Sequence, residues 1–353
     1  MKAWLEALTG KQALLMTYLT KYLRERDCDV IVTTRNYDYA VGIFRNHGIE
    51  PIVIGRYGGL KLKDKLISSL KRQMKLVDII SKEKIDVHIS FTSPDSCRVA
   101  FGLGIPIIQL SDSPHSVFVN KLTVPLSEYL VIPKCIPKED YSRLIDPNKI
   151  VQFNGFFELV WIKRIKPKKE VLEKFSLEER NYIVVRTEES KASYYPKLKQ
   201  KPTVLDRVLK KTLDLTDVKV VIFPRYDDQK KYLYNVFKEY VDRGRVIIVE
   251  KATDSLSLSY FSLAVVTGGS TFAQEAALMG VPSISYFPYH FYVEEEISKQ
   301  GFPLFHIPNT DKCSEKLYNI VEEKVDYRAE SMRKILGLED PLDVIVKLIY
   351  KLK

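Results

Sequence analysis

Hydrophobic residues occur along this chain as short runs, each followed by a polar turn and then by a longer stretch with apolar positions at helical spacing. Short apolar runs are typical of strands buried on both faces of a parallel sheet, and the amphipathic stretches predict helices that cover the sheet. In the first part of the chain the predicted strands are Lys2–Ala7, Asp29–Thr34, Pro51–Ile54, Asp86–Phe91, Ile105–Leu110, Tyr129–Ile132 and Lys149–Phe153. The pattern predicts an α/β fold with a mainly parallel, doubly wound sheet.

The same alternation restarts after a break at Asn154-Gly155 and the basic run KPKKE. The second set of predicted strands is Tyr182–Arg186, Lys219–Phe223, Arg245–Glu250, Ala264–Thr267, Ser283–Phe287 and Pro303–Ile307. A chain of 353 residues is also long for one hydrophobic core. We therefore predict two Rossmann-like domains, 1–155 and 156–353, which face each other across a cleft.

The most informative stretch of the chain runs from Ala264 to Phe287 and reads strand, GGST, helix, strand. Gly268 and Gly269 allow a sharp turn and a close approach to a ligand. Thr271 and Gln274 fit a capping box, which predicts that a helix begins there, and its N-terminus forms an anion site. Ser270 lies in the same turn, and Glu275 is expected in the first turn, where it accepts hydrogen bonds from ligand hydroxyls. The alternative is a tight turn with a purely structural role.

Two successive strand ends in the first half deliver an aspartate to one edge of the predicted sheet. Ser93-Pro94-Asp95 follows the first of these strands. Asp112 follows the second, and His115 lies three residues after it. Carboxylates that converge in this way are suited to acid–base chemistry, although each aspartate alone is equally consistent with a helix cap or an Asx-turn. His115 is either a further catalytic group or a hydrogen-bonding loop residue. Gly10 and Lys11 after the first strand, and Arg35 after the second, are expected at the same edge.

Cationic side chains end two predicted strands of the second half, at Arg186 and at Arg225. Arginines at the edge that holds the GGST turn are suited to bidentate phosphate contacts, whereas pairing with Glu188 or Asp227 is the structural alternative. Glu188 and His290 are further candidates for the cleft. No Asp-x-Asp motif at the carboxyl end of a predicted strand offers the usual carboxylate pair for magnesium, and Asp227-Asp228 is an adjacent acidic pair, so we expect no requirement for a metal.

Composition narrows the class of protein. The formal net charge is +10, which suits a phosphorylated substrate, a nucleic acid, an anionic membrane or a lysine-rich solvated surface. Four scattered cysteines favour a reducing compartment over a disulfide scaffold, and the N-terminus lacks the pattern of a signal peptide. We therefore expect a cytoplasmic protein, with contact at the inner membrane face as an option and nucleic acid as a disfavoured partner.

The full chain resembles an uncharacterised prokaryotic family within the superfamily of GT-B glycosyltransferases and non-hydrolysing UDP-N-acetylglucosamine 2-epimerases. The motifs that carry this resemblance are WLEALTG, TTR, GLGIPIIQLSDSPH, PRYDDQ and the GGST stretch. It implies a GT-B-like fold in which the last helix, Pro341–Leu352, crosses back onto the first domain. It also implies that Gly268, Gly269, Ser270, Thr271 and Glu275 bind a nucleoside-diphosphate sugar, with a UDP-sugar as the leading candidate.

The resemblance leaves two reactions open. Glycosyl transfer to an unidentified acceptor, a lipid-linked one or a glycan precursor, is the first, and 2-epimerisation of a UDP-N-acetylhexosamine is the second. Asp95 and Asp112 match catalytic loops of the epimerases, but Asn120-Lys121 lacks the glutamate that precedes this position in those enzymes. The His-Arg pair of the epimerases is replaced by Arg186-Thr187-Glu188. We therefore expect a transferase. A non-enzymatic basic protein, binding nucleic acid or a membrane through Trp161 or the helix Leu60–Lys84, is the third hypothesis.

Overall fold

The computed structural model describes the chain except for residues 38, 60, 192–194, 196–200, 252 and 353, and it divides into two compact units. Unit 1 comprises Met1–Trp161 and Leu338–Lys353, and unit 2 comprises Ile162–Gly337. The boundary lies after Trp161 rather than at the predicted residue 155. The physical reason is aromatic packing, since the ring of Phe157 contacts the rings of Phe91 and Phe153 in unit 1, both with centroids 5.1 Å away.

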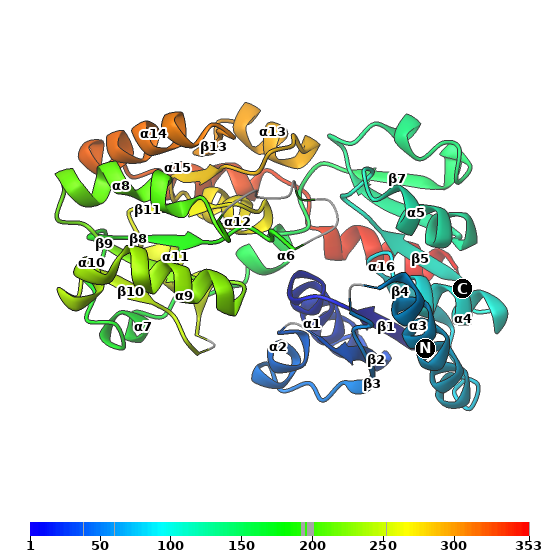
Figure 1. Ribbon diagram of the computed structural model, residues 1–353. Coiled ribbons are helices and arrows are strands. Elements are labelled where there is room, and N and C mark those ends of the chain that lie inside the picture. The colour runs from blue at the N-terminus through cyan, green and yellow to red at the C-terminus, as the bar shows by residue number, and fades with distance from the viewer. Residues whose placement is uncertain (38, 60, 192–194, 196–200, 252, 353) are drawn as a thin grey trace. The chain divides into compact units, whose positions relative to one another are not determined.

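Unit 1 contains seven parallel strands in the order β3-β2-β1-β4-β5-β6-β7 (Figure 1). Their bounds are β1 Lys2–Ala7, β2 Asp29–Asn36, β3 Ile52–Arg56, β4 Val87–Ser90, β5 Ile107–Leu110, β6 Tyr129–Pro133 and β7 Ile150–Phe153. The strand order reverses between β1 and β4. Loops at such a switch point diverge above the carboxyl ends of the strands and leave room for ligand-binding groups.

The helices of unit 1 cover both faces of this sheet. Their bounds are α1 Gly10–Arg24, α2 Ala40–Asn46, α3 Leu62–Ile80, α4 Pro94–Gly102, α5 Val117–Thr123, α6 Leu159–Ile162, which reaches the unit boundary, and α16 Pro341–Lys351, with 3-10 turns at Val124–Leu126, Lys138–Asp140 and Pro147–Lys149. Because crossovers between parallel strands are right-handed, α1 and α2 lie on one face and α3, α4 and α5 on the other. The last helix, α16, contacts α1 and β5, and the Tyr22 hydroxyl on α1 donates to Asp343.

Unit 2 contains six parallel strands in the order β10-β9-β8-β11-β12-β13. Their bounds are β8 Tyr182–Arg186, β9 Lys219–Phe223, β10 Val246–Ile248, β11 Ala264–Thr267, β12 Ser283–Ser285 and β13 Leu304–His306. The helices are α7 Glu170–Glu173, α8 Leu205–Leu215, α9 Asp227–Val236, α10 Lys238–Asp242, α11 Ser255–Phe261, α12 Thr271–Leu278, α13 Tyr292–Lys299, α14 Thr310–Glu323 and α15 Arg328–Leu336. The switch point of this sheet lies between β8 and β11.

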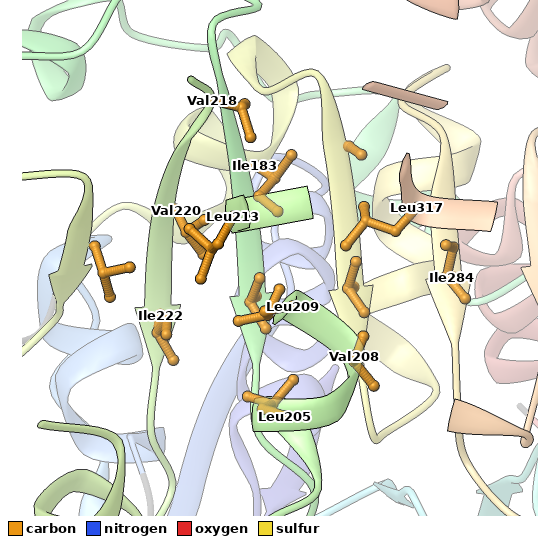
Figure 2. Packing of buried hydrophobic residues seen from close by; sticks show 14 of the residues in the cluster. Ile183, Leu205, Val208, Leu209, Leu213, Val218, Val220, Ile222, Ile284 and Leu317 are labelled. Atoms are coloured by element: carbon orange, nitrogen blue, oxygen red, sulfur yellow. The ribbon is translucent and has the colours of Figure 1, made fainter. Parts of the chain in front are cut away.

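Successive residues of β8 enter different halves of the core of unit 2. Ile183 packs with Val220, Ile222 and Leu209 on one face (Figure 2), while Tyr182 and Val184 enter a second cluster on the other face. A strand that is buried on both faces is apolar along its length, and this is why the run YIVV at the start of β8 predicted a strand. Two parallel sheets with helices between their strands confirm the predicted α/β fold class.

Candidate nucleotide-sugar site

The first glycine of the GGST turn is required by packing inside the protein. A Cβ on Gly268 would lie 2.5 Å from Cβ of Glu188 and 2.7 Å from the ring of Tyr286. The Gly268 amide donates to the Arg186 carbonyl at 3.2 Å, so the turn is drawn directly over the end of β8. Gly268 therefore permits contact between β11 and the segment after β8, rather than contact with a ligand.

The second glycine has only ordinary contacts where a Cβ would lie, and one of them is with a cationic side chain. The nearest atoms to a Cβ on Gly269 would be Oγ1 of Thr267 at 3.7 Å and Nη2 of Arg225 at 3.8 Å. The Gly269 amide donates to Thr267 Oγ1 at 3.0 Å, which holds the turn in shape. The sequence predicted a close ligand approach at both glycines, and at Gly269 the backbone lies next to the Arg225 guanidinium.

Helix α12 begins at Thr271 as predicted, but the expected capping box is absent. The N-cap is Ser270, one residue earlier, so Gln274 falls one position beyond the place that a capping box requires. Its amide instead donates to Ser270 Oγ at 3.0 Å, and its buried Oε1 has no hydrogen-bond partner among the described residues. Glu275 is buried and lies just beyond the first turn, not in it.

The two arginines lie at the same edge of the sheet as this turn. Arg186 pairs in register with Thr267 of β11, and its guanidinium lies over the Phe272 ring at 5.6 Å. Arg225 follows β9, and its backbone amide donates to Thr187 Oγ1 at 2.9 Å. Its guanidinium lies 3.8 Å from the Glu189 carboxylate, so neither of the pairings expected from the sequence, with Glu188 or Asp227, is its ion pair. Arg225 Nε is buried without a hydrogen-bond partner in the described part of the chain.

Glu188, predicted to lie in the cleft, is fully buried instead. Its carboxylate accepts hydrogen bonds from Thr203 Oγ1 at 2.8 Å, the Val204 amide at 2.9 Å and the Tyr286 hydroxyl at 2.8 Å. Burial raises the pKa of Glu188, and these hydrogen bonds oppose that rise. Glu188 therefore joins the start of α8 to β12 beneath Gly268.

A buried carboxylate near the end of β12 was not predicted. Glu294 on α13 is 2% exposed, and neither carboxylate oxygen meets hydrogen-bond geometry with a described residue. Burial raises its pKa to about 8, and the Ser285 hydroxyl offsets only part of this effect. Ser285 also donates to the Gly269 carbonyl at 3.3 Å, which relates Glu294 to the GGST turn. His290 is exposed, and its ring packs on His306 with centroids 4.4 Å apart.

In unit 1 the loops after β1, β5 and β7 form an ion cluster around the buried Glu158, with Lys11 and Asp112 partly buried. Lys11, in the first turn of α1, bonds to Asp112, and its Nζ lies 2.5 Å from the carboxylate of Glu158. Burial disfavours the Lys11 ammonium, but the two carboxylates outweigh it and raise the pKa of Lys11. Burial likewise opposes ionisation of Asp112, but the charge and hydrogen bond of Lys11 lower the pKa of Asp112. Sequence reasoning missed Glu158, although a lone acid in FFELVW was a usable signal.

Asp95 is engaged in a second buried network. Its carboxylate accepts from Ser69 and lies 3.5 Å from Nη1 of Arg72, whose Nη2 is 2.6 Å from Glu6. Arg72 and Glu6 are almost completely buried, so this network joins α3 and α4 to β1. Ser93 is also buried, and its Oγ has no hydrogen-bond partner among the described residues. Asp95 and Asp112 thus lie after adjacent strands, as predicted, but belong to different ion networks.

The remaining candidates of unit 1 surround this edge. Gly10 is the first residue of α1, and the Arg35 guanidinium lies 5.0 Å from the centre of the Tyr37 ring and 5.5 Å from that of Tyr57. His115 is exposed in the loop after β5. Desolvation by the surrounding protein lowers the pKa of His115 against the attraction of Asp112, which favours the neutral ring.

Comparison with known proteins places the chain in a family. The family described as "Protein of unknown function (DUF354)" matches residues 1–353, and the chain belongs to it. An uncharacterized protein of Methanocaldococcus jannaschii, MJ0665, is 26% identical over 350 residues, which cover 97% of this chain and 96% of that protein.

Solved structures share the fold at low identity. The UDP-GlcNAc 2-epimerase of M. jannaschii, in complex with UDP-GlcNAc and UDP, matches with a TM-score of 0.72 and 17% identity over 99% of this chain and 100% of that chain. A glycosyltransferase of Rickettsia africae matches with a TM-score of 0.67 and 12% identity, over 99% and 98% of the two chains. The fold is therefore GT-B-like, built from two Rossmann-like units.

The described residues lack two features. They contain no group of three or more His, Cys, Asp or Glu side chains arranged to hold a metal ion. In the same part of the chain, no helix combines the length and the apolar character needed to cross a bilayer.

Proposed function

We propose that this protein is a nucleotide-sugar-dependent glycosyltransferase, with a UDP-sugar as the leading donor. The observation that carries the proposal is the GGST turn, where the backbone at Gly269 lies beside Arg225 at the start of α12 and a Cβ there would meet, among the described residues, only Thr267 and Arg225, at 3.7 Å or more. Backbone amides at a helix N-terminus and a guanidinium are the groups that bind a diphosphate without a metal. The buried Nε of Arg225 lacks a hydrogen-bond partner within the described residues, which supports a role in ligand binding.

Each residue of the site then has a role in transfer. The backbone amides of Ser270 and Thr271 bind the diphosphate beside Gly269, whose own amide is held by Thr267, and Arg225 and Arg186 neutralise the charge that develops as the diphosphate leaves. Glu275 accepts hydrogen bonds from the ribose hydroxyls, as the family resemblance implies. No metal is required in this scheme, and Gln274 orients the turn through its bond to Ser270.

Unit 1 supplies the group that accepts the proton of the acceptor hydroxyl. A general base must be accessible and should have a pKa near the working pH. Asp112 is ionised but held by Lys11, and Asp95 is held by Arg72 and Ser69. His115 is exposed and neutral at pH 7, with Asp112 contributing a favourable charge, so we assign it as the base and Asp112 as the group that stabilises its protonated form.

Titration calorimetry tests nucleotide binding directly. UDP, GDP and their sugars are titrated with a chelator present, and at least one is expected to bind. Arg225→Ala should weaken that binding about 10- to 100-fold, because charge-assisted hydrogen bonds are worth about 1.5–3 kcal/mol. Arg243→Ala is the matched control, since this exposed arginine pairs with Glu239 elsewhere on unit 2. Absence of binding by every nucleotide, or full affinity in both Arg225→Ala and Glu275→Ala, would contradict the proposal.

Epimerisation of a UDP-N-acetylhexosamine at C2 is the second candidate. It is favoured by the three carboxylates of unit 1, Asp95, Asp112 and Glu158, because proton removal and return at one carbon needs several acid–base groups. In heavy water an epimerase incorporates deuterium at C2 without an acceptor, whereas we expect no incorporation here. NMR of the recovered sugar measures this, and deuterium at C2 would replace the transferase assignment with the epimerase one.

The proposal also includes the sugar acceptor and the place of the enzyme in the cell. We propose a cytoplasmic enzyme with a lipid-linked or glycan-precursor acceptor and peripheral contact with the inner membrane face. A purely non-enzymatic role on nucleic acid predicts a salt-dependent gel shift at physiological salt, which we do not expect. The aromatic residue considered for such a surface, Trp161, is fully buried.

A further inference from the structure

We propose that the outer face of α3, with the neighbouring α4 and α5, docks onto an anionic bilayer surface. Four large apolar side chains recur along α3 at four-residue spacing, Leu62, Leu66, Leu70 and Met74, and each is between 52% and 82% exposed. Residues four apart lie on one side of a helix, so they form a continuous stripe. We call this the α3 stripe. Ile67 and Val77 are also exposed and widen it.

The helices beside α3 continue the apolar surface. α3 contacts α4, α4 contacts α5, and all three lie on the same face of the sheet (Figure 1). Phe101 on α4 and Phe118 and Leu122 on α5 are exposed, Phe118 by 83%. An apolar surface of this extent on a soluble unit marks a docking site.

The charge around the α3 stripe identifies what docks there. Lys71 and Lys75 follow one edge of the stripe, and Lys63 lies within it, while Arg98 and Lys121 lie on α4 and α5. None of these five cations takes part in an ion pair within the described residues, and on α3 alone Lys63, Lys71 and Lys75 outnumber the two acidic residues Asp64 and Asp78. Exposed leucines and phenylalanines with unpaired lysines are the composition of a surface that lies on anionic lipid. A symmetric contact between two copies would instead bring these lysines against each other.

This surface adjoins the candidate site of unit 1. Helix α5 begins directly after the loop that holds Asp112 and His115, at the carboxyl edge of the sheet. A unit docked through α3 and α5 holds that edge near the lipid headgroups, which selects an acceptor carried on a lipid. This last step rests on the proposed function, whereas docking itself does not.

Co-sedimentation with vesicles tests the docking. The full chain is expected to pellet with vesicles of phosphatidylglycerol and phosphatidylcholine in equal parts, and not with phosphatidylcholine alone. Leu66→Gln/Met74→Gln and Lys71→Glu/Lys75→Glu should each reduce partitioning at least tenfold, because each lysine near an anionic surface contributes about a fivefold factor. The matched controls are Leu215→Gln, an equally exposed leucine on α8, and Lys210→Glu on the same helix, and both should pellet like the native chain.

Several results would overturn the inference. They are no pelleting with the anionic vesicles, equal losses in the α8 controls, or a dimer in light scattering that Leu66→Gln/Met74→Gln converts to a monomer. UDP calorimetry on this double variant separates the two proposals. Unchanged UDP affinity with lost pelleting supports docking, and pelleting without any nucleotide binding would overturn only the proposed function.

Discussion

Gly268→Ala is expected to destabilise the protein by about 3 kcal/mol, whereas Gly269→Ala should change stability by less than about 0.5 kcal/mol. The methyl group at 268 would overlap Glu188 and the Tyr286 ring, with Cα of Glu188 only 2.8 Å away, and this backbone atom cannot move aside cheaply. At 269 the nearest atoms lie 3.7 Å away or more, which is ordinary contact distance. Urea unfolding monitored by circular dichroism measures both changes.

The same pair of variants separates a structural glycine from a ligand-binding one. Gly269→Ala should fold normally but bind UDP at least about tenfold more weakly, since its methyl group occupies the space beside Arg225. Gly268→Ala, at a temperature where it remains folded, should bind within about threefold of the native chain, because the change lies beneath the turn. A stable Gly268→Ala, or a Gly269→Ala with unchanged affinity, would show that the roles of these glycines have been misassigned.

Lys11→Met is expected to destabilise unit 1 by about 3 kcal/mol at pH 7, because it leaves the buried carboxylate of Glu158 and the partly buried one of Asp112 without a cation. Lys11→Arg retains the charge and is the matched control. Asp112→Asn in the Lys11→Met background should recover part of the loss, since it removes one of the two uncompensated charges. Thermal and urea unfolding of the four chains provide the comparison.

The pH dependence of this effect has a defined sign. The pKa of Asp112 is lowered in the folded chain, so its pairing contributes stability above its unfolded pKa and loses it as pH falls through the folded value. The pKa of Lys11 is raised, so its contribution is complete below the unfolded value and is lost as pH rises through the folded one. The difference between native and Lys11→Met chains should therefore be largest around neutral pH and shrink in acid. A difference that stays constant from pH 7 to acid would contradict the ion cluster.

The elements of the fold were largely predictable because they depend on local sequence. The strands Lys2–Ala7, Tyr182–Arg186, Lys219–Phe223 and Ala264–Thr267 have the predicted bounds. The last three are short runs rich in β-branched residues between polar turns, which is typical of strands buried on both faces, whereas Lys2–Ala7 includes the buried Glu6 that pairs with Arg72. The long basic helix was predicted from Leu60 to Lys84 and is observed as Leu62–Ile80, with residue 60 outside the described part of the chain. The ends differ because caps, not periodicity, decide where a helix begins and ends.

The sequence predicted where the candidate site residues lie in the fold, but not which groups they contact. Parallel topology sends every βα loop to one edge, so Lys11, Asp95, Asp112, Arg186 and Arg225 were expected at strand ends, and they are found there. Their partners lie far away in sequence and came from outside the motifs. Glu158 completes the Lys11 cluster, and Arg72 with Ser69 engages Asp95.

Periodicity and turn residues act over a few positions, so they were enough to predict the class of fold and the edge of each sheet where chemistry is possible. Tertiary packing decided that Gly268 lies tightly against Glu188 and Tyr286, whereas Gly269 has only ordinary contacts beside Arg225. It also decided that the Glu188 carboxylate accepts hydrogen bonds inside the protein, from Thr203, Val204 and Tyr286, instead of facing a ligand. The physical reason is that the function of a polar group depends on whether burial, a distant counter-charge or solvent surrounds it, and none of these is encoded within the residues next to it.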